Sequence, residues 1–115
     1  MAKAPEFKSL QDFYPYYLSE HSLASTRLSH FIGTSLLFVI IIFALSKAQY
    51  SYLWLLPIAG YGFAWFGHFF FEKNKPATFQ YPFYSLASDF IMYWHILSFQ
   101  INAKMEEALK KYPKE

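Results

Sequence analysis

Two long apolar runs joined by a short connection constrain this chain more than any other feature of its sequence. Phe31–Leu45 reads FIGTSLLFVIIIFAL, and Leu28–His30 extend it toward the roughly 20 residues that a membrane-spanning helix needs. Tyr50–Phe71 has no charged residue and is long enough to span with some tilt. The SKAQYS segment between them is so short that the two spans must be antiparallel neighbours. The sequence therefore predicts a transmembrane helical hairpin.

Composition supports an integral membrane protein of the all-α class. Hydrophobic residues make up 55% of the 115 residues and charged residues only 16%, against about a quarter in soluble domains. Because the length suits one domain, we expect residues 1–115 to form a single membrane-embedded helical domain. The net charge of +2 is small and the basic residues are scattered, which argues against a nucleic-acid partner. Without cysteine, disulfides and thiolate metal sites are excluded.

A third apolar run, Tyr81–Ile101, carries polar residues that include Asp89 and His95. Its helical periodicity predicts an amphipathic helix, which either lies in the membrane interface or spans with its polar side against protein. If this helix does not span, nine basic residues lie on one side of the membrane and Lys47 alone on the other, whereas a spanning helix gives five on each side. The positive-inside rule therefore favours a shallow or re-entrant helix and a cytoplasmic N-terminus, in a bacterial inner membrane or the endoplasmic reticulum.

The segment before the hairpin predicts an N-terminal helix followed by a break. Ser9 and Asp12 have the spacing of a capping box, and Pro15 should kink or interrupt the helix that they begin. The SLAST segment, residues 22–26, contains hydroxyl side chains that can cap a new helix. The candidates for that cap are Ser22, Ser25 and Thr26.

Topology should bring three histidines together on one side of the membrane. His30 lies at the start of the first span and His68 about one turn before the end of the second, so antiparallel spans place them at similar depth. His21 precedes them, and a break in the helix after it allows its ring to turn toward the same point. Two carboxylates can reach this cluster: Glu72 is at i+4 from His68, and Asp89 lies about 10 Å along the third helix.

The fourth histidine, His95, lies about 20 Å along the third helix, so we expect it to stay outside the cluster. Neutral imidazole is the commonest protein ligand for zinc, copper and iron, and carboxylates complete many such sites. Simpler interpretations remain open for the single residues. An interfacial histidine can be no more than a hydrogen-bonded side chain, and Glu72 can pair with Lys75 or Arg27 at the surface.

Two segments resemble a known family. YYLSEHSLASTRLSHFIGT and GYGFAWFGHFFFEKNKPATFQYPFYSLASDF are similar to the small membrane proteins related to the fungal 2-hydroxy fatty acid dioxygenase, and the resemblance covers roughly Phe13 to Met92. The matching positions in the two halves are Tyr17, His21, Arg27, His30, Gly33, Gly67, His68, Glu72, Lys73, Pro76 and Ala77. The resemblance implies an Fe(II)-dependent, membrane-embedded enzyme whose metal ligands are His21, His30 and His68. His95 lies outside the pattern, and the short chain resembles the compact bacterial-type members.

The expected function is therefore an Fe(II)-dependent membrane dioxygenase that uses O2 to shorten 2-hydroxy fatty acids by one carbon (α-oxidation). The carboxylate and hydroxyl of the substrate would chelate the iron. Glu72 or Asp89 would be a fourth ligand or would orient a ring, and Arg27 would attract the substrate carboxylate. Two alternatives remain open: a haem protein with His30 and His68 as axial ligands, and a metal-free membrane scaffold. Acyl chain length and oligomeric state are not predicted.

Overall fold

Helices account for all the regular secondary structure of residues 6–113, the part of the chain that this computed structural model describes. This confirms the predicted all-α class. Five α-helices follow one another along the chain, with three short helical turns, η1 to η3, between them. The helices are α1 (Leu10–Ser19), α2 (Ala24–Ser46), α3 (Leu55–Phe66), α4 (Pro82–Leu97) and α5 (Ile101–Lys111), and the turns are η1 (Tyr50–Trp54), η2 (Gly67–Glu72) and η3 (Ala77–Phe79).

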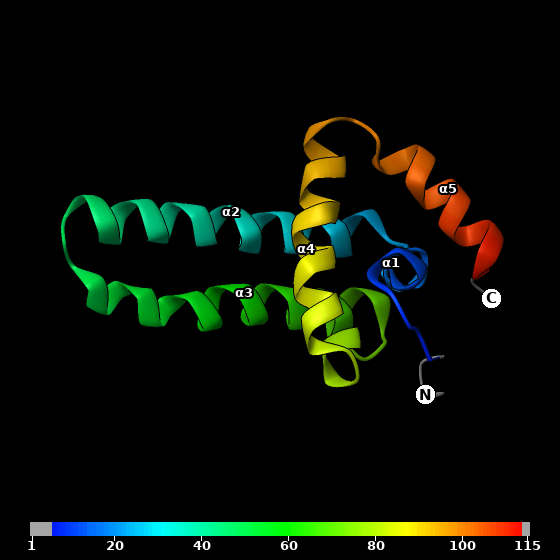
Figure 1. Cartoon of the computed structure of the whole chain (residues 1–115), viewed down its shortest axis with the longest axis horizontal. Helices are drawn as coiled ribbons and strands as arrows, with labels where there is room; N and C mark the ends of the chain where they lie inside the picture. The colour runs from blue at the N-terminus through cyan, green and yellow to red at the C-terminus, as the bar shows by residue number, and fades with distance from the viewer. Residues whose placement is uncertain (1–5, 114–115) are drawn as a thin grey trace.

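The predicted hairpin is formed by α2 and α3, which lie side by side and antiparallel (Figure 1). Ala24–Ser46 and Tyr50–Glu72 each contain 23 residues and are long and apolar enough to cross a membrane. At 1.5 Å per residue such a helix measures about 34 Å, slightly more than a hydrocarbon core of about 30 Å. The connection reverses direction within a few residues, and Ala48 takes a left-handed conformation there with φ 53°.

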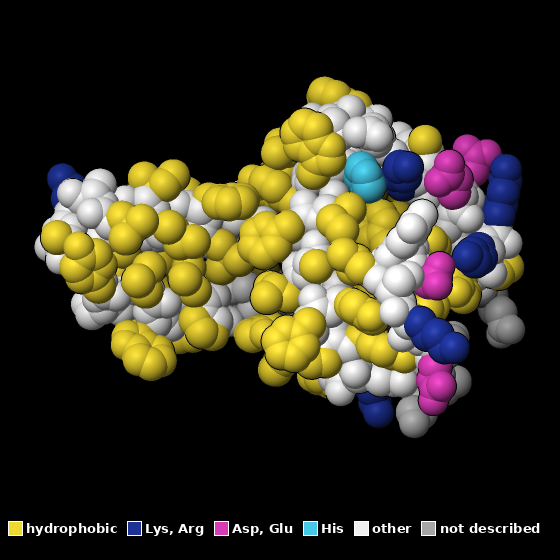
Figure 2. Space-filling model, in the orientation of Figure 1, with side chains coloured by type: hydrophobic (Ala, Val, Ile, Leu, Met, Phe, Trp, Pro, Cys, Tyr) yellow, Lys and Arg dark blue, Asp and Glu magenta, His cyan; other side chains and the backbone are white. Residues whose placement is uncertain are grey.

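The outer surface of the hairpin is apolar, whereas charged side chains gather at the other end of the molecule, over α1 and α5 (Figure 2). Ile42, Ile58 and Trp54 expose 67, 69 and 81% of their surface. Soluble proteins rarely expose such a large continuous apolar area, so a lipid environment explains it.

Glycines permit close contact between the two spans near the histidines. A Cβ atom added to Gly33 of α2 would lie 2.9 Å from the Cβ of Phe63 in α3, and one added to Gly67 would lie 3.2 Å from the Cβ of Ser29. Real Cβ atoms essentially never approach to 2.9 Å, and 3.2 Å is tighter than most real Cβ contacts; small residues are the usual means of bringing membrane helices together. The two contacts place the start of α2 against the end of α3.

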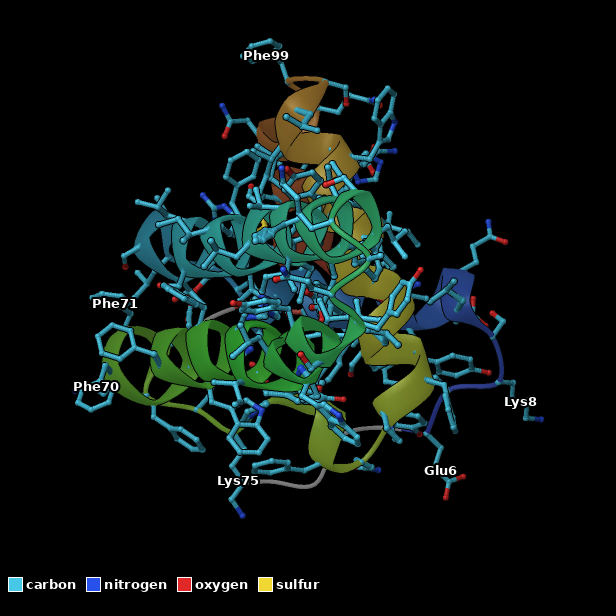
Figure 3. All side chains as sticks on the ribbon, turned by 90° about the vertical axis from the view of Figure 1, so that its left-hand side faces the viewer. Glu6, Lys8, Phe70, Phe71, Lys75 and Phe99 are labelled. Carbon is cyan, nitrogen blue, oxygen red and sulfur yellow. The ribbon has the colours of Figure 1, made fainter. Side chains whose placement is uncertain are left out.

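Helix α4 crosses the hairpin instead of running along it, and it lies beside one side of the α2 and α3 pair (Figures 1 and 3). It packs on α2 through stacked Phe31 and Tyr93 rings, whose centroids are 4.7 Å apart. Its buried residues are Ser85, Ser88 and Met92, so its polar face lies against protein. Among residues 6–113, only Ala24–Ser46 and Tyr50–Glu72 qualify as spans by length and composition. The predicted amphipathic helix is confirmed, although it ends at Leu97 and not at Ile101.

The ends of the described chain meet at the base of the hairpin. Ser9 caps α1 by accepting a hydrogen bond from the Asp12 amide, as predicted, but Pro15 does not interrupt the helix. Phe13 of α1 is fully buried against α4 and α5. Because α5 returns to α1, its lysines lie at the same end of the molecule as the start of the chain (Figure 1). This arrangement agrees with a third helix that does not span.

Candidate metal centre

His21, His30 and His68 meet in the interior of the protein, as the topology predicts. Each offers a ring nitrogen within 4.8 Å of those of the other two, and the ring centroids are 4.3 to 5.2 Å apart. The three residues expose at most 6% of their surface. Three imidazoles from three separate segments of the chain therefore surround one point between the start of α2 and the end of the second span.

The chain between α1 and α2 places His21. Helix α1 ends at Ser19 and α2 begins at Ala24, so the predicted break is present. The Nδ1 atom of His21 lies 2.6 Å from the carbonyl oxygen of Tyr17, one turn earlier. A carbonyl can only accept, so Nδ1 carries the proton and the lone pair is on Nε2. That Nε2 atom lies 3.0 Å from Nε2 of His30.

Glu72 and Arg27 fix this connection from two sides. The Glu72 carboxylate accepts hydrogen bonds from the backbone N–H of Leu23 and from the Ser22 hydroxyl, the latter at 2.9 Å. Arg27 Nη1 donates to the carbonyl oxygens of His21 and Ser22, at 2.8 and 2.9 Å. The prediction that Ser22, Ser25 or Thr26 caps α2 is wrong, because the N-cap residue is Leu23, which has no polar side chain. Glu72, from the second span, supplies the negative charge that a helix N-terminus favours.

Asn74 holds His68. The second span ends in a π-helical turn, Gly67–Glu72, after which Lys73 takes a left-handed conformation with φ 62°. That reversal turns Asn74 back, so its Oδ1 atom lies 2.7 Å from Nδ1 of His68. The Nδ2 atom of Asn74 donates to the carbonyl oxygen of Glu20 at 3.1 Å, which fixes the orientation of the amide. The second span thus ends at Glu72, one residue beyond the predicted apolar run Tyr50–Phe71.

Asp89 and Tyr17 hold His30. One carboxylate oxygen of Asp89, on α4, lies 3.3 Å from Nδ1 of His30 and accepts the hydroxyl hydrogen of Tyr17. Burial and the Asp89 charge raise the pKa of the Tyr17 phenol well above its usual range, so it remains a donor. The Tyr17 ring also stacks on His21, with centroids 4.1 Å apart. Tyr17 therefore supports His21 through its ring and carbonyl, and supports His30 through Asp89.

The three histidines share one bonding pattern. Each Nδ1 faces an acceptor: a backbone carbonyl for His21, a carboxylate for His30 and an amide oxygen for His68. Each Nε2 is then left with a lone pair, and metal-binding histidines are oriented in this way. Burial, together with the two neighbouring imidazoles, lowers the pKa of His21 well below its usual range, so this ring stays neutral.

This donor set fits a metal ion. Three buried lone pairs that face one another are stabilised only by a cation or a proton between them. Nε2 of His21 and Nε2 of His30 lie 3.0 Å apart, which is a hydrogen-bond distance when one of them carries a proton and is also short enough for both to bind one ion. Imidazoles suit zinc, copper, iron and nickel, so the ligands do not select among these metals.

The other predicted site residues take positions around the cluster. Asp89 supports a ring, whereas Glu72 and Arg27 bond to the connection that carries His21. His95 stays outside the cluster, as predicted, with Nδ1 2.7 Å from the hydroxyl of Tyr14. Along α4, His95 lies six residues beyond Asp89, a separation of about 9 Å. Sequence reasoning missed Asn74, because it lies just beyond the second apolar run and no charge or motif marks it.

Comparisons with known proteins point to one family. The model of the family described as 2-hydroxy-palmitic acid dioxygenase Mpo1-like matches residues 7–101 of this chain. That range includes the three histidines and the residues that hold them. Neither the curated proteins nor the solved structures contain a match to this chain.

Proposed function

We propose that this chain, which belongs to the 2-hydroxy-palmitic acid dioxygenase Mpo1-like family, is an iron-dependent membrane dioxygenase that shortens 2-hydroxy fatty acids by one carbon. The observation that carries the proposal is the convergence of three buried Nε2 lone pairs, each fixed by an acceptor on Nδ1. A family match alone names a chemistry, and the cluster supplies a place where this chain can perform it.

In this proposal His21, His30 and His68 hold Fe(II). The bound ion supplies the electrons that O2 activation requires, and three imidazoles leave coordination positions free for other ligands. The histidines themselves do not discriminate iron from zinc, so the choice of iron comes from membership of a dioxygenase family. The buried position of the cluster excludes bulk water from the reaction.

The surrounding residues act as positioning groups. Asp89 and Tyr17 keep the His30 ring in one tautomer and one orientation, and Asn74 does the same for His68. Glu72 and Arg27 act one step further out, because they hold the connection that carries His21. We therefore assign the three predicted catalytic residues, Glu72, Asp89 and Arg27, to support of the metal ligands.

The overall reaction balances with one O2 for each substrate molecule. A 2-hydroxy acid, R–CH(OH)–COOH, and O2 give R–COOH, CO2 and H2O. The C1–C2 bond breaks, C2 is oxidised to the new carboxyl carbon and O2 is the oxidant. The ratio of O2 consumed to acid formed is therefore a quantity that an assay can measure.

The alternative functions have less support from the geometry. Axial histidines of a haem lie on opposite faces of the macrocycle. Here the ring centroids of His30 and His68 are only 5.2 Å apart and that of His21 lies 4.3 Å from each, so the three rings form a compact triangle with no space for a macrocycle between two of them. A metal-free scaffold is compatible with the hydrogen bond between the Nε2 atoms of His21 and His30, but it gives no reason for three imidazoles from separate segments to converge on one point.

The test is O2 consumption by protein loaded anaerobically with Fe(II) in detergent. We expect uptake with a long-chain 2-hydroxy fatty acid, one acid product that is one carbon shorter per O2, and much slower uptake with the same acid lacking the 2-hydroxyl. Zinc-loaded protein is the matched control and should consume none, because zinc has no redox chemistry. Iron-loaded protein that shows no uptake across a series of chain lengths would contradict the proposal.

A further inference from the structure

A groove of about 340 Å³ begins at the metal centre and is enclosed by α2, α3 and α4. His30 and Asp89 contribute to its lining, so it reaches two residues of the site. The volume falls within the range of about 300–1,000 Å³ that is usual for small-molecule sites. A ligand in the groove can therefore reach His30, the one histidine of the cluster that contributes to the lining.

The groove follows one face of α2 toward the hairpin turn. His30, Thr34, Leu37, Phe38 and Ile41 line it, and these positions recur at the helical repeat. His30 and Ile41 are 11 residues apart, so this face extends about 16 Å at 1.5 Å per residue. Helix α3 runs antiparallel to α2 and supplies the opposite wall (Figure 1).

Polarity is unevenly distributed along this length. The imidazole and the carboxylate of the lining, His30 and Asp89, lie at the metal end, and the lining also includes the Tyr61 phenol on α3. Beyond Thr34 the α2 wall is entirely apolar, and Leu56 and Pro57 line the groove from α3 on the side of the hairpin turn. A ligand that fits this pattern has a polar head at the metal and a long apolar tail.

Gly60 sets the width of the groove. A Cβ atom added there would lie 3.5 and 3.8 Å from the two terminal methyl carbons of Leu37, across the groove. Leu37 is seven residues from His30, so this narrow point is about 10 Å from the metal end. Gly62, two residues along the same helix, has nothing within 4 Å of an added Cβ and lines a different cavity, which contains no histidine or carboxylate.

We infer that this groove holds the acyl chain of the substrate, with the carboxyl end at the metal and the methyl end beside Ile41 and Leu56. The inference rests on the proposed function, and adds where the tail lies and which residue limits its length. The length of about 16 Å is close to half of a hydrocarbon core of about 30 Å, the depth that one lipid chain occupies. Moving an acyl chain from the lipid bilayer into an apolar groove releases little free energy, because both surroundings are apolar. Steric fit, and not burial, therefore selects the length of the acyl chain.

The first test compares Gly60→Leu with Gly62→Leu across a series of 2-hydroxy acids. A leucine at position 60 blocks the groove about 10 Å from the metal end, whereas the seven C–C bonds of an eight-carbon acid, each about 1.5 Å long, advance only about 9 Å along an extended zigzag chain and end before the block. We expect Gly60→Leu to lower turnover of the sixteen-carbon acid at least about tenfold, because its acyl tail and the leucine side chain would overpack the same space. Turnover of the eight-carbon acid should be kept. Gly62→Leu should keep the wild-type profile. Equal loss with both variants, or an unchanged profile in Gly60→Leu, would overturn the inference.

The second test uses wild-type protein and measures photolabelling, so it requires neither enzyme activity nor a correctly folded variant. Zinc-loaded wild-type protein is irradiated with 2-hydroxyhexadecanoic acids that carry a diazirine either near the carboxyl end or near the methyl end, and the labelled residues are mapped by mass spectrometry. We expect the first probe to label Thr34 or Leu37 and the second to label Ile41, Leu56 or Pro57. Labels in the reverse order, or confined to the cavity lined by Gly62, would refute the inference even if the enzyme is active. Ordered labels without any O2 uptake by the iron form would support the groove and contradict the proposed function.

Discussion

Asn74 offers a sharp test of how the site is held together, because no pattern in the sequence marks it. Replacing it with alanine removes three side-chain hydrogen bonds: to Nδ1 of His68 at 2.7 Å, to the carbonyl of Glu20 at 3.1 Å and to the carboxylate of Glu20 at 3.4 Å. The backbone bond from the N–H of residue 74 to the carbonyl of His68, at 3.0 Å, is unaffected. The variant therefore loses the acceptor for a metal ligand while the chain reversal is kept.

The expected magnitudes follow from the loss of the bond to His68. Loss of a partner that orients a metal ligand lowers metal affinity by about 10–100-fold, or about 1.4–2.7 kcal/mol. Leaving the buried Nδ1 donor of His68 unpaired should also lower the free energy of unfolding of the metal-free protein by about 1–3 kcal/mol. Asn102→Ala, at an exposed position on α5, is the matched control and should change neither quantity.

The assay is a competition titration with zinc and a chelator in detergent, run beside thermal unfolding of the metal-free protein. The two readouts distinguish a ligand-orienting role from a purely structural one, since a structural role lowers stability alone. Metal affinity for Asn74→Ala within about twofold of wild type, far below the expected 10–100-fold loss, would refute the account of His68.

Three further predictions test other parts of the structure. Gly33→Ala should lower the melting temperature, because its Cβ would lie 2.9 Å from that of Phe63, whereas Gly62→Ala should not; equal melting would contradict the close contact of α2 and α3. The metal-free protein should lose stability as pH falls below about 6.5, since the folded pKa of His21 is lowered and the unfolded chain then binds more protons; a melting temperature that rises between pH 7 and 5 would contradict this. A cysteine at Gln49 should react with an impermeant maleimide from outside intact cells and one at Lys110 only after lysis; labelling of both from the same side would refute the topology.

The sequence predicts the hairpin well, because its signal is a long run of apolar residues. It places the start of the first span at Leu28, four residues after α2 begins at Ala24, since the charged Arg27 does not look like part of a membrane span. The first turn of α2 is polar because that part of the helix faces the metal centre and its supporting bonds, not lipid. The start of the apolar run therefore marks where α2 begins to face lipid, and not where the helix itself begins.

The histidine cluster is also predictable, whereas its supports are not. Antiparallel spans place His30 and His68 at one depth regardless of detail, so topology alone brings them together. Asn74 reaches His68 only because a π-helical turn and the left-handed Lys73 redirect the chain, and neither has a clear sequence signal. The end of α4 was missed for a similar reason, since Phe99 is left-handed with φ 62° although it is not a glycine.

The central claim is that His21, His30 and His68 hold one metal ion and that His95 takes no part. It is tested most directly by the metal content per chain of protein purified without chelator, for the wild type and for the alanine variant of each histidine. The account predicts one ion per chain in the wild type and in His95→Ala, and none in His21→Ala, His30→Ala or His68→Ala, because each of these removes one of three ligands. A full complement of metal in any of those three variants, or its loss in His95→Ala, would contradict it.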